Sequence, residues 1–203
     1  WARLMRDVYG AADPRSQQLR IFAFTAGSTL TAQQPLNNVV RASVEAMAAA
    51  LAGVQTMHVS AFDEALGVPT EAAATLALRT QQVVAFETGL TSTVDPLAGS
   101  YAVETLTDEL EAAIDALLEQ ISERGGALAC IESGEFEREL ADAAYEHALA
   151  VERGERVVVG VNRFPAPAEP LDVFRIDPGV EQSQADAVQE VRRTRDGAAG
   201  EAA

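Results

Sequence analysis

The sequence contains no lysine, a single cysteine and no long uninterrupted hydrophobic run. Its 15 basic residues are therefore all arginines, and they stand against 31 acidic residues, which gives a formal net charge of −16. A strongly negative surface repels nucleic-acid phosphates and anionic lipid headgroups, so nucleic-acid binding and membrane-surface binding are disfavoured. No apolar stretch approaches the roughly 18 residues of a membrane-spanning helix, so the sequence gives no sign of a membrane protein.

The lone cysteine, Cys130, excludes a disulfide framework within the chain, and this favours a cytoplasmic location. It lies in the apolar segment GGALACIESG, where a buried small side chain is more common than a reactive nucleophile. The chain begins at Trp1, already within a helical pattern, and we therefore expect it to be part of a longer protein.

Two apolar segments predict strands at residues 19–24 and 54–59, and amphipathic helices follow them at 35–52 and 69–87. This alternation is typical of a parallel sheet. Two parallel strands cannot cover their own edges, and a complete (β/α)₈ barrel needs about 250 residues. The predicted fold class is therefore α/β, as part of a (β/α)₈ TIM barrel. The expected core face of the first helix carries Val39, Val40, Val44, Met47 and Leu51.

The second half of the chain predicts a mainly helical extension. Residues 107–125 and 134–152 have helical periodicity, 157–161 are typical of a short strand, and 181–196 indicate a polar helix. The segment PAPAEP indicates an extended linker. The predicted domain organisation is a barrel portion at 1–100, a helical extension with a short strand at 101–164, and a linker with a terminal helix at 165–203.

The loops after the two predicted strands are the candidate functional segments, because parallel α/β folds place their chemistry at the carboxyl ends of strands. Small residues from Gly27 to Thr29 in the first of these loops would let a ligand approach the backbone closely. Amide side chains crowd the start of the next helix, where capping and turn formation are their ordinary roles. These amides are Gln33, Gln34, Asn37 and Asn38.

The second of these loops contains His58, Asp63 and Glu64, a combination that suggests acid–base chemistry or metal binding. Its spacing matches no firm metal-binding pattern, and we predict no metal site. A histidine at a strand end is more often a hydrogen-bonded core residue, and His147 within a predicted helix is expected to have a surface or packing role. The residues alone identify no catalytic side chain.

Four segments resemble the large subunit of the coenzyme-B12-dependent acyl-CoA mutases, the family that includes methylmalonyl-CoA mutase and isobutyryl-CoA mutase. The segments are AGSTLTAQQPLNNVVR, FDEALGVPTE, VDPLAGSYAVE and GERVVVGVNRF. Together they are highly specific, and the resemblance runs from Arg15 to about Phe164. It implies that the chain supplies the last two βα units of the family's (β/α)₈ barrel and the helical segment beyond them.

The resemblance implies an isomerase that uses adenosylcobalamin for a radical carbon-skeleton rearrangement of a short-chain acyl-CoA, of the methylmalonyl-CoA or isobutyryl-CoA type. By position, Gly27 and Ser28 would lie against the corrin ring, and Glu64 and Ala65 at the upper face of the cofactor, where Glu64 could hydrogen-bond the adenosyl ribose. The family's cobalamin-binding pattern, Asp-x-His-x-x-Gly, does not occur in this chain. The implied partners are the acyl-CoA substrate, a cobalamin-binding domain or small subunit, the remainder of the barrel, and a second copy in a dimer.

The sequence departs from the family pattern at Phe22 and Phe24, where the family commonly has a His and a Gln that face the acyl-CoA. Side chains two apart on a strand share a face, so both rings would line the substrate pocket. Two aromatic rings remove hydrogen-bonding groups and would solvate a substrate carboxylate poorly. A more apolar acyl group, a shifted specificity and a degenerate inactive copy are all compatible with this change.

Two hypotheses therefore follow from the sequence. In the first, the chain is the C-terminal barrel portion of a mutase catalytic subunit and is inactive when isolated. In the second, it is a truncated, non-catalytic mutase remnant that acts as an interaction or structural module.

Overall fold

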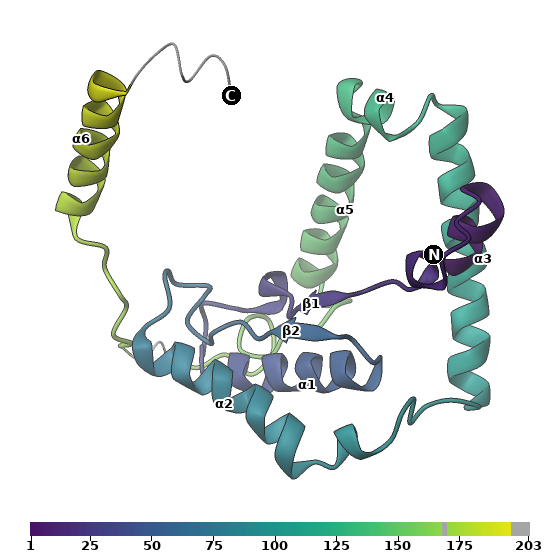
Figure 1. The fold of residues 1–203 in the computed structure, drawn as a ribbon. Helices are drawn as coiled ribbons and strands as arrows, with labels where there is room; N and C mark the ends of the chain where they lie inside the picture. The colour runs from purple at the N-terminus through teal and green to yellow at the C-terminus, as the bar shows by residue number, and fades with distance from the viewer. Residues whose placement is uncertain (168–169, 196–203) are drawn as a thin grey trace.

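The computed structural model describes residues 1–167 and 170–195, and it is mostly helical with one small two-stranded parallel sheet (Figure 1). Each strand is followed by a helix, as the sequence predicts, and the longer helices of the second half follow in turn. Short helical turns occur at Leu4–Val8, Pro14–Gln17, Gly27–Thr29 and Leu90–Ser92. The main elements are β1 (Phe22–Phe24), α1 (Asn37–Leu51), β2 (Thr56–His58), α2 (Glu71–Glu87), α3 (Tyr101–Glu123), α4 (Ala127–Glu132), α5 (Glu135–Glu152) and α6 (Pro178–Thr194).

The two strands pair in parallel, with Ala23 of β1 opposite Met57 of β2. A backbone hydrogen bond from the Thr25 nitrogen to the His58 oxygen, 3.1 Å long, continues the pairing past the strand ends. Each strand is three residues long, half the predicted length, because within the described residues each strand has a single neighbour. The described residues therefore contain two βα units joined by a two-stranded parallel sheet, within a structure that is mostly helical.

The hydrophobic core lies between α1, α2 and the end of β2, and it is built largely from alanine. Small side chains let the two helices and the strand approach one another closely, so their packing needs no large residue at the contact. The buried cluster consists of Ala42, Ala46, Val59, Ala77 and Val84.

The predicted core face of α1 was wrong for Val40, Val44 and Met47, three of its five residues, while Val39 and Leu51 are half-buried. Val40, Val44 and Met47 are 64%, 55% and 42% exposed, whereas Ala42 and Ala46 on another face are buried. Helical periodicity located an apolar stripe of large residues, but the close contact with α2 selects the small ones instead. Val40, Val44 and Met47 remain largely uncovered by the described part of the chain.

Asn38 at the start of α1 is completely buried and joins two loops. Its Nδ2 donates to the carbonyl oxygens of Thr31 and Phe62, both at 2.8 Å. Its Oδ1 accepts hydrogen bonds from the Thr31 nitrogen at 3.0 Å and from Arg41 Nη1 at 2.8 Å. Both donors and both acceptor sites of the amide are used, which is the condition for burying it without a large penalty.

Replacing Asn38 with alanine should lower the free energy of unfolding by about 2 kcal/mol, because it leaves half-buried backbone groups of two loops unpaired. Thermal denaturation followed by circular dichroism measures this loss as a lower midpoint. Asn37→Ala is the matched control, since Asn37 Nδ2 makes one side-chain hydrogen bond, to Gln34 Oε1 at 2.9 Å. Equal midpoints for the two variants would contradict the role of Asn38.

The helical extension begins earlier than predicted and contains an additional helix. α3 starts at Tyr101 rather than at residue 107, because Glu104 in its first turn accepts a hydrogen bond from the Gly99 nitrogen at 2.9 Å and so stabilises the helix start. The short helix α4 lies between α3 and α5 at one end of the extension (Figure 1). Left-handed backbone at Gly126 and Gly134, with φ of 89° and 68°, separates the three helices.

The strand predicted at residues 157–161 was wrong, because this segment forms a tight turn with one isolated bridge between Val159 and Arg163. The side chain of Asn162 organises the turn. Its Oδ1 accepts from the Val158 nitrogen, and its Nδ2 donates to the oxygens of Val151 and Arg156, all at 2.7 Å. A run of β-branched residues predicts a strand, but this local set of hydrogen bonds outweighs that preference.

The terminal helix was predicted at 181–196 and is observed as α6, beginning at Pro178. Asp177 caps it, because its Oδ1 accepts a hydrogen bond from the Gly179 nitrogen at 2.8 Å. Residues 168–169 of the predicted linker and the predicted helix end at Asp196 lie outside the described residues. Among the helices described, none is both long enough and apolar enough to cross a membrane.

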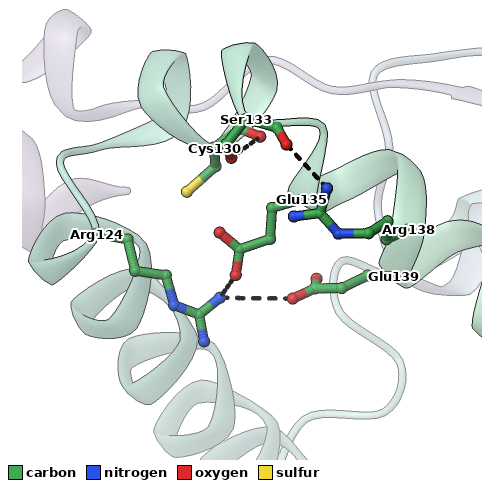
Figure 2. A network of polar contacts seen from close by, with 6 residues as sticks. All are labelled: Arg124, Cys130, Ser133, Glu135, Arg138 and Glu139. Carbon is green, nitrogen blue, oxygen red and sulfur yellow. Dashed lines mark hydrogen bonds and ion pairs between the residues drawn. The ribbon is translucent and has the colours of Figure 1, made fainter.

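Cys130 lies in α4 and is 1% exposed, which confirms the prediction of a buried thiol. Figure 2 shows its surroundings, where Arg124 of α3 pairs with Glu135 and, at 3.5 Å, with Glu139 of α5. Burial raises the pKa of the Cys130 thiol, and the nearby Glu135 carboxylate raises it further. The ion pairs join the ends of α3 and α5 across the buried sulfur.

We expect Cys130 to react slowly with iodoacetamide in the native protein at pH 8. A raised pKa keeps the thiol protonated at this pH, and the thiolate is the species that alkylates. The rate, followed by mass spectrometry, should rise only above the ordinary thiol pKa and should become fast after denaturation in urea. Rapid native alkylation at pH 7 would contradict this expectation.

Candidate functional site

Two loops leave the carboxyl ends of the strands at the same edge of the sheet, because β1 and β2 are parallel. We call residues 25–34 the first loop and residues 59–70 the second loop. Gly27 and Glu64 meet there, since a Cβ atom built on Gly27 would overlap Glu64 Oε1 and would lie 3.4 Å from Glu64 Cδ. Gly27 does not have a left-handed φ, so its backbone conformation does not itself require glycine, and the missing side chain leaves room for the end of the Glu64 side chain.

Glu45 on α1 holds the start of the first loop. Its Oε2 accepts a hydrogen bond from the Ala26 nitrogen, and its Oε1 accepts one from Thr29 Oγ1, both at 2.7 Å. Bonds to an ionised carboxylate are stronger than neutral ones, and these two fix the chain on both sides of Gly27. Sequence reasoning missed Glu45, because no sequence pattern connects a helical glutamate to backbone groups of a preceding loop.

Thr25 and Ser60 join the two loops directly. The Ser60 nitrogen donates to Thr25 Oγ1 at 2.8 Å, and Ser60 Oγ donates to the Thr25 oxygen at 3.0 Å. Both residues are buried, so water does not compete for these bonds. The two loops are therefore held together at their bases by two hydrogen bonds that Ser60 donates to Thr25.

Asp63 holds the second loop against the start of α2. Its Oδ2 accepts hydrogen bonds from the Thr70 nitrogen and from Thr70 Oγ1, both at 2.9 Å, and Thr70 Oγ1 accepts in turn from the Ala73 nitrogen. Asp63 is buried, and its Oδ1 has no hydrogen-bond partner among the described residues. Of the two adjacent acids, Asp63 is thus committed to the helix cap, and Glu64 presents its carboxylate at the site.

The four residues predicted to face the cofactor lie on these two loops. The structure brings Gly27 and Glu64 together, and both are partly exposed. Their neighbours in the chain, Ser28 and Ala65, are exposed. These residues form an accessible surface of small side chains with one carboxylate, which can accept a hydrogen bond from a ligand hydroxyl group.

Phe22 and Phe24 lie on the open face of the sheet, 64% and 54% exposed, and the prediction that they share a side is confirmed. Met57, which points to the other face, packs against the core. The Phe24 ring lies 4.6 Å from the His58 ring, centroid to centroid, at an angle of 54°. The sheet therefore has one face covered by the core and one face that carries aromatic rings into open space.

The interpretation of His58 as a core residue was wrong, because its side chain is exposed beside Phe24. Strand alternation gives the covered face to Met57 and leaves His58 on the open one. His147 lies on the surface of α5, as expected, with Nδ1 2.6 Å from Arg156 Nη1. Within residues 1–167 and 170–195, no group of three or more His, Cys, Asp or Glu side chains is placed to hold a metal ion.

Comparison with known proteins gives one family over the entire chain. The profile described as Methylmalonyl-CoA mutase matches residues 1–203. The chain is 42% identical over 198 residues to the 2-hydroxyisobutanoyl-CoA mutase large subunit of Aquincola tertiaricarbonis, which covers 97% of this chain and 35% of that protein. It is 44% identical over 197 residues to methylmalonyl-CoA mutase of Escherichia coli (strain K12), which covers 96% of this chain and 28% of that protein.

A third relative, the probable mitochondrial methylmalonyl-CoA mutase of Caenorhabditis elegans, is 36% identical over 198 residues, or 97% of this chain and 27% of that protein. The chain thus spans about a third or less of the length of these relatives. Because the family profile matches every residue, the chain belongs to the methylmalonyl-CoA mutase family and corresponds to part of an acyl-CoA mutase large subunit.

Proposed function

We propose that this chain forms the last two βα units of the barrel in an adenosylcobalamin-dependent mutase, which isomerises the carbon skeleton of a short-chain acyl-CoA. The observation that carries the proposal is the contact between Gly27 and Glu64 on loops that follow neighbouring parallel strands. In parallel α/β folds this edge is where ligands bind.

The open sheet supports a barrel that is completed by other strands. Each described strand has one neighbour, and the face that carries Phe22 and Phe24 is uncovered, while the helices lie on the opposite face. In a closed barrel the helices lie outside and the uncovered face becomes the interior. The partners proposed for this chain are the remaining strands, a cobalamin-binding domain or subunit, and a second large subunit.

The residues at the strand ends fit a corrin cofactor. The small, exposed side chains of Ser28 and Ala65 leave space for a flat ring, and Glu64, whose carboxylate lies where a Gly27 side chain would be, can accept a hydrogen bond from a ribose hydroxyl. When bound, adenosylcobalamin supplies a weak cobalt–carbon bond whose homolysis starts the rearrangement. The contribution of this chain is to position Glu64, to leave room beside it, and to exclude water from the barrel interior.

Phe22 and Phe24 favour an apolar acyl group over one that carries a carboxylate. Their rings occupy the face proposed as the barrel interior, and Phe24 also packs beside His58. Moving a carboxylate from water to an aromatic surface without a hydrogen-bonding partner is unfavourable. An isobutyryl-type substrate therefore fits this interior better than methylmalonyl-CoA does.

We expect the complete large subunit, together with its cobalamin-binding domain or subunit, to isomerise isobutyryl-CoA in the presence of adenosylcobalamin, at least about tenfold more efficiently than methylmalonyl-CoA. Gas chromatography of the released acids measures both products. The isolated chain should give no product, because most of the barrel is missing. Product from the chain alone would refute the proposal, and an inactive complete enzyme would favour the alternative of a non-catalytic interaction module.

Glu64→Ala in the complete enzyme should slow cobalt–carbon homolysis by about tenfold, because it removes a charged hydrogen-bond acceptor from the cofactor edge. Stopped-flow absorbance after mixing with substrate measures the homolysis rate. Glu71→Ala is the control, since Glu71 is an exposed acid in the first turn of α2. An unchanged rate in Glu64→Ala would remove Glu64 from the site.

A further inference from the structure

The turn at residues 157–164, here called the returning turn, contacts the start of α1 although more than 110 residues separate them in the chain. In Figure 1 the chain descends along α5 and returns to the region of α1 and the strands. The contacts consist of side chains from the first βα unit that donate to backbone carbonyl groups of the turn.

Two donors make this connection. Arg41 Nη2 donates to the Val159 oxygen at 2.7 Å, and Gln34 Nε2 donates to the Phe164 oxygen at 2.9 Å. The carbonyl groups are presented in fixed directions, because Asn162 organises the turn internally through three hydrogen bonds. The connection is therefore formed between two preorganised parts.

Gly160 lets the two parts approach each other. It is buried and has a φ of +84°, which already disfavours a side chain. A Cβ built on it would lie 3.2 Å from Gln34 Cδ and 3.4 Å from Gln34 Cβ. Gln34 thus packs on the backbone of the turn as well as donating to it.

The two residues joined by this hydrogen bond both have left-handed backbone, which is uncommon outside glycine. Gln34 has a φ of 48° and Phe164 a φ of 54°. Such conformations persist where the surroundings determine them strongly. The hydrogen bond between Gln34 and Phe164 is one such determinant, and it acts on the end of the first loop.

We propose that the returning turn locks the first loop in place and that Gln34 is a positioning residue for the edge formed by Gly27 and Glu64; this role rests on the function proposed above. Glu45 fixes the start of the first loop on α1, and the bond from Gln34 to the returning turn fixes its end. The helical extension thereby influences the position of Gly27 and Glu64, although its own contact with the first loop is distant from the proposed cofactor.

The test compares Gln34→Ala with Gln33→Ala in the complete large subunit. Gln33 is the matched control, because it is the preceding glutamine and its side chain is exposed. Hydrogen exchange measured by mass spectrometry should show about fivefold faster exchange of the first loop in Gln34→Ala and no change in Gln33→Ala. The amides of Leu30 and Thr31 report on the loop, since both are hydrogen-bonded in the native structure.

The second measurement is the concentration of adenosylcobalamin that gives half-maximal activity. Gln34→Ala should raise this half-saturating concentration about fivefold, because a misplaced loop weakens cofactor binding, and it should leave kcat at saturating cofactor within about twofold. General destabilisation would instead lower kcat, because it reduces the fraction of active enzyme. Gln34→Glu retains the packing on Gly160 but loses the donor, so it should behave like Gln34→Ala. A wild-type response from Gln34→Glu would overturn the role of the hydrogen bond.

Equal exchange of the first loop in Gln34→Ala and Gln33→Ala would overturn the lock. Faster exchange with an unchanged half-saturating concentration would overturn the assignment of Gln34 as a positioning residue. If the wild-type enzyme shows no cobalamin-dependent activity, the proposed function fails, and the exchange comparison still decides whether the returning turn holds the loop.

Discussion

The structure around the strand ends depends on one buried amide. Asn38 connects Thr31 in the first loop to Phe62 in the second, and Arg41 closes the network from the next turn of α1. A buried amide with every donor and acceptor paired specifies one arrangement of the groups around it, because any displacement leaves polar atoms unpaired in a medium without water. The other contacts that hold these loops, from Glu45, Ser60 and Asp63, act on an arrangement in which Asn38 already joins one loop to the other.

Much of the first half of the fold could be predicted from the sequence, because its signals are local. Strand–helix alternation located both βα units, and Thr70 and Pro69 marked the start of α2. The packing face of α1 could not be predicted by the same reasoning, since Ala42 and Ala46 are selected by the approach of a helix distant in the chain. The strand predicted at 157–161 was wrong for a related reason, because Asn162 makes side-chain hydrogen bonds that no propensity scale includes.

The candidate site was predicted in part. The resemblance named Gly27 and Glu64, and the structure adds that the Glu64 carboxylate lies where a side chain on residue 27 would begin. Glu45 and Arg41 were missed, because they act on backbone groups of loops that sequence patterns do not connect to a helix. Residues that touch a ligand leave motifs in a sequence, whereas residues that hold those motifs in place are recognised from the folded arrangement.

The geometry at Gly27 has a consequence for how this edge can change during evolution. Its backbone conformation is open to any amino acid, and the nearest obstacle to a side chain at this position is the end of the Glu64 side chain. A larger residue at position 27 becomes sterically acceptable once position 64 is shortened, so the two positions should vary as a pair across descendants of this sequence. A lineage that abandoned the carboxylate would be free to close the space with a methyl group, and such a compensated pair would mark the loss of the ligand from that branch.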